Sequence, residues 1–200
     1  MTNKSKSRVA FQGEPGAFSE EAALKLFAKD EIELVPRRTF EELFQSIERG
    51  VADYILAPIE NSIAGVVHSS VKLLRTTPLR ILDEVEIKIE QHLIGCRDAS
   101  FDNLEIVQSH PVALAQCRRF FEANPNLKSV VADDTAGSVA EIVRIGDPKR
   151  AAIAGERAAV LYGATIIRRT IQDHAENYTR FVLLETSVPQ TYPASKGKAS

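Results

Sequence analysis

The sequence predicts an α/β protein of two lobes with a ligand cleft between them. Short apolar runs alternate with amphipathic stretches along most of the chain, a pattern typical of α/β folds with mostly parallel sheets. A long extended stretch at 80–94 interrupts this alternation, and a strand-like segment at 179–185 follows the last expected helix. The two interruptions indicate two crossings between lobes. We therefore expect residues 1–78 and 171–187 in lobe 1 and residues 79–170 in lobe 2.

The first part of the chain is expected to alternate three strands with three helices. Ser19 can cap the first helix, and Thr39 with Glu42 forms a capping-box pattern at the start of the second. Gly50 is a natural stop for that second helix. We expect strands at 8–12, 32–35 and 54–59, and helices at 19–29, 39–49 and 66–75.

The alternation resumes after the extended stretch. Pro111 suits the first position of a helix, Asp134 or Thr135 can cap the next one, and Gly163 ends the last. We expect strands at 106–107, 129–132, 151–154 and 179–185, and helices at 111–124, 134–145 and 156–162. The segment 188–200 is rich in Pro, Ser and Lys, and we expect it to be disordered.

Composition excludes several classes of function. A net charge of −2 over 200 residues leaves no basic footprint for nucleic acid, and no apolar stretch is long enough to cross a membrane. The first residues contain no apolar signal core, so a cytoplasmic location is expected. Four histidines and two cysteines show no metal-ligand spacing, so no metal is expected. The sequence also has no P-loop, no G-x-G-x-x-G loop and no G-x-S-x-G nucleophile motif.

Two polar clusters follow predicted strands in the body of the chain. "PIENSIAG" offers Glu60, Asn61 and Ser62 directly after a strand, although a simple turn with a helix cap explains them equally well. "QSHPVALAQC" places Ser109 and Gln116 seven residues apart, close to two helical turns, so both can lie on one face near the helix start. Capping by Ser109 and an exposed Gln116 are the alternatives.

Two further clusters come later. In "ADDTAGSVAE", the small side chains around Thr135 and Ala136 allow another group to approach a helix start. In "NYTRFVLLE", a buried strand begins with Thr179 and Arg180. Strand propensity can explain the threonine and a surface ion pair can explain the arginine.

Taken together and in order, these clusters resemble the prephenate dehydratase family. The matching pieces run from Arg8 to Leu184: "VAFQGEPGAFSEEAA", "PIENSIAG", "HLIG", "SHPVALAQC", "DDTAGSVAE", "AAIAGERAAVLYG" and "NYTRF". The resemblance implies a two-lobed fold like that of type II periplasmic binding proteins. It also implies conversion of prephenate to phenylpyruvate, water and carbon dioxide without a cofactor, as a step of phenylalanine biosynthesis.

The resemblance assigns roles that the local patterns leave open. It implies that Thr179 is the main catalytic residue and that Asn61, Ser109 and Gln116 complete the active site. It implies substrate contacts for a wider set: Glu60, Ser62, Ser19, Thr135, Ala136, Arg180 and Phe181. For Arg180, pairing with a substrate carboxylate and structural pairing with Glu60 are equally compatible with the pattern.

Two more expectations come from the family. Members associate through this domain, so a homodimer is expected. Many members continue into a C-terminal ACT domain that binds phenylalanine, whereas this chain ends a short tail after Glu185, so no ACT domain is expected here.

Two alternative functions remain compatible with the pattern. Arogenate dehydratases carry nearly the same motifs and act on the transaminated analogue of prephenate. A small-molecule-binding module on the same fold would be a function of a different class.

Overall fold

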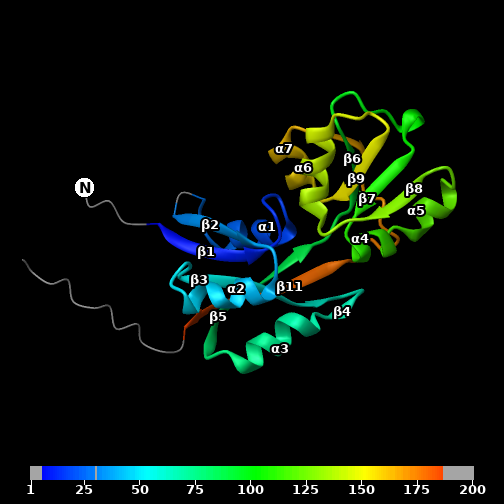
Figure 1. The fold of residues 1–200 in the computed structure, drawn as a ribbon. Coiled ribbons are helices and arrows are strands. Elements are labelled where there is room, and N and C mark those ends of the chain that lie inside the picture. Colours follow the sequence, from blue (N-terminus) through cyan, green and yellow to red (C-terminus); the bar gives the residue numbers. More distant parts are fainter. Residues whose placement is uncertain (1–5, 30, 187–200) are drawn as a thin grey trace, which may run out of the picture.

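A computed structural model describes residues 6–29 and 31–186 and contains two sheets, one in each lobe. Figure 1 shows the two lobes side by side, joined by strands that pass between them. The expected two-lobed α/β architecture is therefore confirmed. The predicted disordered segment 188–200 lies outside the described residues. In the described part, no helix has the length and apolar character needed to cross a bilayer.

Lobe 1 contains a six-stranded sheet in the order β2-β1-β3-β11-β5, with the short β4 paired to β3. Its strands are β1 (Ser7–Gln12), β2 (Ile32–Arg37), β3 (Tyr54–Asn61), β4 (Gly65–Val66), β5 (Leu79–Lys88) and β11 (Tyr178–Thr186). Its helices are α1 (Phe18–Leu26), α2 (Phe40–Glu48) and α3 (His68–Thr76).

Lobe 2 contains a five-stranded sheet in the order β10-β6-β9-β7-β8. Its strands are β6 (His92–Gly95), β7 (Ile106–Ser109), β8 (Lys128–Val131), β9 (Arg150–Ala154) and β10 (Thr165–Arg168). Its helices are α4 (Pro111–Ala115), α5 (Arg118–Ala123), α6 (Thr135–Ile145) and α7 (Glu156–Tyr162), with a 3-10 turn η1 at Phe101–Asn103.

Both sheets are mixed, which corrects the expectation of mostly parallel sheets. Strands β1, β2 and β3 are parallel, but β11 runs antiparallel to both β3 and β5. In lobe 2, β6 runs antiparallel to β9 and β10, while β7 is parallel to β8 and β9. The physical reason in lobe 1 is the double crossing: β5 leaves the lobe and β11 returns to it, so the two strands run in opposite directions.

The predicted start of lobe 2 at residue 79 is wrong. Strand β5 pairs with β11 from Leu79 opposite Thr186 to Lys88 opposite Tyr178, with one register shift at Leu82, and so belongs to the sheet of lobe 1. The extended stretch is in fact two strands in two different sheets, and the chain crosses between them at residues 89–91. Local alternation reveals an extended chain but not the sheet in which it pairs.

Tertiary contacts also change the helix boundaries. The expected helix 111–124 is divided into α4 and α5, because Asp173 binds at the break between them. The Asp173 carboxylate accepts the backbone N–H groups of Arg118 and Arg119. The backbone N–H of Asp173 donates to the Gln116 carbonyl at 2.7 Å. Helix α1 ends at Leu26, and its N-cap is Ala17 rather than Ser19. The Thr39 cap of α2 is confirmed, since its hydroxyl accepts the Glu42 N–H at 3.1 Å.

The loop before α1 docks lobe 1 onto α7 of lobe 2. Gly16 has φ +91°, and a Cβ there would lie 2.9 Å from the Cα of Ala158. Glu20 is buried, accepts the Gly16 N–H at 2.5 Å and forms an ion pair with Arg157 of α7. The hydroxyl of Tyr162 donates to the Pro15 carbonyl at 2.8 Å. These contacts place the start of α1 beside the space between the lobes.

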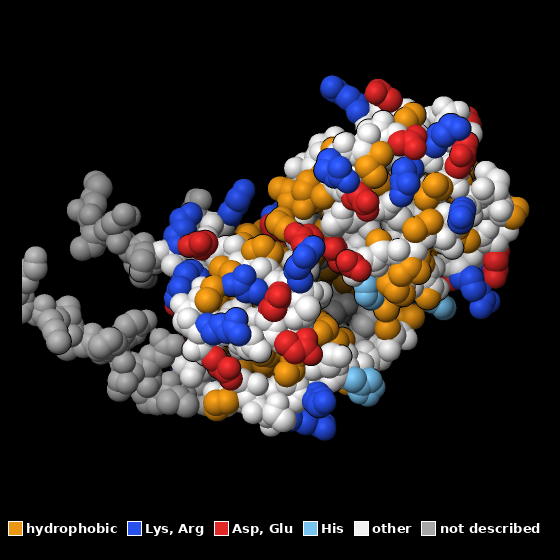
Figure 2. Space-filling view, in the orientation of Figure 1, with side chains coloured by type: hydrophobic (Ala, Val, Ile, Leu, Met, Phe, Trp, Pro, Cys, Tyr) orange, Lys and Arg blue, Asp and Glu red, His pale blue; other side chains and the backbone are white. Residues whose placement is uncertain are grey.

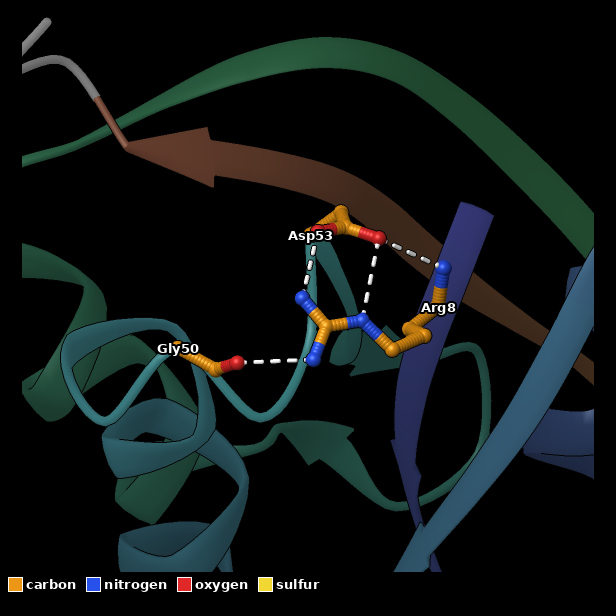
Figure 3. Close-up of polar contacts among 3 residues, drawn as sticks. All are labelled: Arg8, Gly50 and Asp53. Atoms are coloured by element: carbon orange, nitrogen blue, oxygen red, sulfur yellow. Dashed lines mark hydrogen bonds and ion pairs between the residues drawn. The ribbon is translucent and has the colours of Figure 1, made fainter. Parts of the chain in front are cut away.

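The start of β1 is held to the loop before β3 by one polar cluster (Figure 3). The Asp53 carboxylate accepts the backbone N–H of Arg8 at 2.8 Å and its guanidinium at 2.7 Å, while the same guanidinium donates to the Gly50 carbonyl. The hydrogen bond from the Arg8 side chain lowers the pKa of Asp53 below its ordinary value. The Arg8 and Asp53 side chains are 36% and 35% exposed, so the contribution of the cluster to stability is modest.

This cluster generates a prediction about acid stability. A lowered carboxyl pKa in the folded state stabilises the protein above the unfolded pKa of about 4, and the contribution is lost as pH falls through the folded value. Asp53→Asn should therefore lower the free energy of unfolding by about 1 kcal/mol or less at about pH 7. The difference from wild type should shrink below about pH 4.

Urea unfolding at a series of pH values measures the effect. Asp102→Asn, a change at an exposed carboxylate on the other lobe, is the matched control. A difference between wild type and Asp53→Asn that stays constant from neutral to acid pH would contradict the assignment.

Candidate active site

A cleft of about 430 Å³ lies between the lobes and is lined from both of them. Lobe 1 contributes side chains at the ends of β1 and β3 and at the starts of α1 and β11, and lobe 2 contributes the starts of α4 and α6. Figure 2 shows the face on which the lobes meet, with acidic side chains beside a hollow. The cleft forms where β1 and β3 of one sheet and β7 and β8 of the other end, the usual position for ligands in α/β folds.

Asn61 and Thr179 face each other across paired strands. Asn61 ends β3 and is paired with Thr179 of β11. The Nδ2 of Asn61 donates to the Thr179 hydroxyl oxygen at 2.9 Å, and its Oδ1 accepts the backbone N–H groups of Ile63 and Ala64 at 3.0 and 2.7 Å. Both side chains line the cleft. The Thr179 hydroxyl oxygen therefore accepts a hydrogen bond from Asn61, and the hydroxyl proton is free to point into the cleft.

Gln116 reaches the same network from lobe 2. Its Oε1 accepts a hydrogen bond from Asn177 Nδ2 at 3.0 Å, and Asn177 Oδ1 in turn accepts from Asn61 Nδ2 at 2.8 Å. Gln91, in the first crossing, donates to the same Gln116 oxygen at 3.5 Å. Gln116 lines the cleft, and its amide nitrogen has no hydrogen-bond partner among the described residues. The structure thus brings Asn61, Gln116 and Thr179 together in one inter-lobe site.

Ser109 departs from its predicted place in the cleft. It ends β7 with a fully buried side chain, and its hydroxyl donates to the Ile153 carbonyl at 2.6 Å. It is not among the residues that line the cleft. The hydroxyl instead joins β7 to β9, and the neighbouring His110 faces the cleft as the N-cap of α4.

Five residues of the predicted substrate-binding set do not line the cleft. Arg180 forms ion pairs with Glu60 at 2.8 Å and with Glu84, which favours the structural pairing left open by the sequence. Ser62 accepts the Tyr178 N–H at 2.9 Å and holds the loop after β3. Phe181 is buried in the lobe 1 core, and Ala136 packs in a core cluster with Val139 and Ile142 of α6.

The other two members of that set do line the cleft. Ser19 lies in the first turn of α1, and Thr135 is the first residue of α6. Backbone N–H groups in the first turn of a helix have no intrahelical partner and favour anions. The Ser19 hydroxyl lies in the first turn of α1, which no side chain caps, whereas the Asp134 carboxylate already caps the start of α6 beside Thr135.

The charges at the cleft are acidic or neutral. Asp133 and Asp134 line it, and none of the described residues that line it is Lys or Arg. Asp134 is engaged as the N-cap of α6, accepting the Gly137 N–H at 2.6 Å. Burial lowers the pKa of His110, opposed by Asp134, so its imidazole is neutral near pH 7. The described residues also contain no group of three or more His, Cys, Asp or Glu able to hold a metal ion.

Several residues of the site were not anticipated from the sequence. Asn177 belongs to the network, and Gln91, Phe18 and Phe40 line the cleft. Asn177 had a signal, since it opens the "NYTRF" piece two residues before Thr179. Gln91 had none, because the crossing that places it opposite Gln116 is a tertiary feature.

Comparison with known proteins identifies the family. The family model for prephenate dehydratase matches residues 9–188. The Arabidopsis thaliana protein named arogenate dehydratase/prephenate dehydratase 2, chloroplastic, is 38% identical over 96% of this chain and 50% of its own. This chain spans about half the length of the curated relatives that it matches.

Solved structures agree with that result. The prephenate dehydratase of Arthrobacter aurescens, solved in complex with L-Phe, has a TM-score of 0.82 at 26% identity, covering 95% of this chain and 63% of its own. A structure described as a quorum quenching acylase, GqqA, has a TM-score of 0.78 at 33% identity, covering 93% and 66%. The family model covers most of the chain, and the chain therefore belongs to the prephenate dehydratase family.

Proposed function

We propose that this domain catalyses the decarboxylating dehydration of prephenate to phenylpyruvate, a carbon–oxygen lyase reaction of phenylalanine biosynthesis. The observation that carries the proposal is the Thr179 hydroxyl, which accepts a hydrogen bond from Asn61 and lines the cleft. Membership of the prephenate dehydratase family supplies the substrate class.

The reaction requires few catalytic groups from the protein. Prephenate is a cyclohexadiene that carries a carboxylate at one ring carbon and a hydroxyl at the opposite one. Loss of the carboxylate as carbon dioxide leaves an electron pair that moves through the ring and expels the hydroxyl, which takes up one proton and leaves as water. The ring becomes aromatic, and this drives the step. The main barrier is the departure of the hydroxyl.

Thr179 acts on that departing hydroxyl. A threonine is a very weak acid, so we assign it a hydrogen bond to the leaving oxygen rather than full proton transfer, and the proton comes from solvent. Because Asn61 holds the Thr179 oxygen in place, the hydroxyl is preorganised for the transition state. The remaining cleft groups orient the substrate.

The substrate is a dianion, and no Lys or Arg of the described residues lines the cleft. Neutral donors are left to receive the carboxylates: the first turn of α1 with Ser19, the hydroxyl of Thr135, and the amide nitrogen of Gln116. Such donors select a ligand by the positions of its carboxylate oxygens more than by its net charge.

Arogenate is the second candidate substrate, and Asp133 is the observation that favours it. Arogenate carries an ammonium group where prephenate has a keto group, and the Asp133 carboxylate lines the cleft. The acylase activity named for one solved neighbour has no such support. The described lining residues include no Ser, Thr or Cys side chain hydrogen-bonded to a histidine, as acyl transfer usually requires.

A side-by-side assay with prephenate and arogenate tests the function. We expect phenylpyruvate from prephenate at a higher kcat/KM than phenylalanine from arogenate. A higher kcat/KM with arogenate would support the alternative, and turnover of neither would leave a binding module as the function. The homodimer and the cytoplasmic location stay predictions from the sequence.

The Thr179 hydroxyl should act mainly in the transition state. Thr179→Ala should therefore lower kcat by about 10²–10⁴-fold with KM little changed. Thr179→Ser keeps the hydroxyl but loses the β-branch that restricts χ1, so it should retain part of the activity. Steady-state kinetics with thermal melts of both variants provide the measurement, and near wild-type kcat in folded Thr179→Ala protein would remove Thr179 from the mechanism.

Ser109 should behave differently, because its buried hydroxyl is engaged with Ile153. Ser109→Ala leaves that carbonyl without its donor and should cost about 1–3 kcal/mol of stability. We expect kcat/KM to fall by less than about tenfold, since no bond to the leaving group is lost. Urea unfolding and kinetics of the same preparation check both. A loss of activity as large as that of Thr179→Ala, with stability unchanged, would return Ser109 to the catalytic set.

A further inference from the structure

A chain of buried amides connects the two lobes at the back of the cleft. Its centre is Asn177, which is 1% exposed and lies in the second crossing, just before β11. We propose that Asn177 is a positioning residue: it holds Gln116 as a hydrogen-bond donor toward the cleft and, with Asn61, fixes the geometry behind Thr179. The proposal rests on the proposed function for its kinetic consequences, but its structural content is independent.

Two backbone N–H groups set the orientation of the side-chain amides in this network. The N–H groups of Ile63 and Ala64 can only donate, so the atom of Asn61 that they contact at 3.0 and 2.7 Å must be the oxygen. The other end of that amide is then a donor. It contacts the Thr179 oxygen at 2.9 Å and Oδ1 of Asn177 at 2.8 Å.

The orientation of each side-chain amide fixes the orientation of the next. Because Asn177 accepts from Asn61 with its oxygen, its nitrogen is the end that faces Gln116, at 3.0 Å. Gln116 must accept that bond with its own oxygen, so its nitrogen is left toward the cleft that it lines. Two loop N–H groups of lobe 1 thereby decide which end of a lobe 2 side chain meets the ligand.

Asn177 also ties the crossings to each other. Its backbone carbonyl accepts the N–H of Ile89, in the first crossing, at 2.7 Å. One residue therefore joins both connecting segments through its backbone and both lobes through its side chain. The result is a cleft in which Gln116 and Thr179 can each donate a hydrogen bond. This suits a ligand whose carboxylates and leaving hydroxyl accept hydrogen bonds there.

Two substitutions separate this role from simple packing. Asn177→Asp is nearly isosteric, but an ionised carboxylate can only accept, so Gln116 must turn its nitrogen to the introduced carboxylate and its oxygen to the cleft. Asn177→Ala imposes neither orientation on the Gln116 amide. At about pH 8, where the introduced carboxyl is ionised beside the Asn61 donor, we expect kcat/KM to fall roughly tenfold for Ala and roughly a hundredfold for Asp.

The order of these losses excludes a residue that only fills space, and amide NMR then separates the orientation of Gln116 from repulsion between the introduced carboxylate and the dianionic substrate. A residue that only filled space would tolerate the isosteric Asp better than Ala. Asn124→Asp is the matched control, since it makes the same chemical change at an amide that caps α5 by donating to Phe120 and is absent from the cleft lining. It should leave kcat/KM unchanged. Comparison is restricted to variants whose thermal melts show folded protein, and an Ala variant impaired as much as the Asp variant overturns the proposal.

Side-chain amide NMR tests the orientation without activity. In the wild type, the Gln116 NH₂ protons should exchange rapidly with water because they face the cleft, whereas the Asn177 NH₂ protons should be protected. The Gln116 signals are assigned by their loss in Gln116→Glu. In Asn177→Asp they should become protected, because they then donate to the carboxylate.

The two measurements also separate this proposal from the proposed function. If the wild type turns over neither prephenate nor arogenate, the function fails, and the NMR result still decides the amide orientation. Protected Gln116 protons in the wild type, or exchange unchanged in folded Asn177→Asp, overturn the role of Asn177 even in an active enzyme.

Discussion

The insertion of β11 between β3 and β5 is the interaction on which the rest of the molecule depends. This strand comes from the end of the described chain, yet it occupies an interior position of the lobe 1 sheet and buries Phe181, Val182 and Leu184. Lobe 1 is therefore complete only after the chain has built lobe 2 and returned. The same register that buries the strand places Thr179 opposite Asn61, so the site and the core of lobe 1 form together.

An irregularity in that pairing separates catalysis from packing. The register between β11 and β3 shifts between Arg180 and Phe181, at the point where the strand leaves the cleft and enters the core. Bulges of this kind re-aim side chains next to active sites. Here Thr179 lines the cleft, Arg180 pairs with Glu60, and Phe181 packs in the core. Three consecutive residues of one motif thus have three different physical roles.

The crossings impose a further constraint, because they bury polar groups between the lobes. A buried amide without partners is costly, and the network of Asn61, Asn177 and Gln116 satisfies this requirement while it orients the cleft donors. On the other side of the interface, the buried Glu20 is compensated by Arg157 and by the Gly16 N–H. In the amide network, the same groups thus satisfy the buried contact between the lobes and set the geometry of the site.

The sequence by itself determined the α/β class, most strands and helices, and the family. These depend on local patterns: period-2 and helical alternation, the Thr39 cap, and ordered motifs around Asn61, Gln116 and Thr179. Only the tertiary structure decided which sheet holds β5, why Asp173 divides the helix after Pro111, and that Ser109 faces β9 rather than the cleft. The physical reason is that hydrogen-bond partners across a crossing are distant in the sequence. A side chain's role at such a place is decided by the partner that it meets there, which no local pattern encodes.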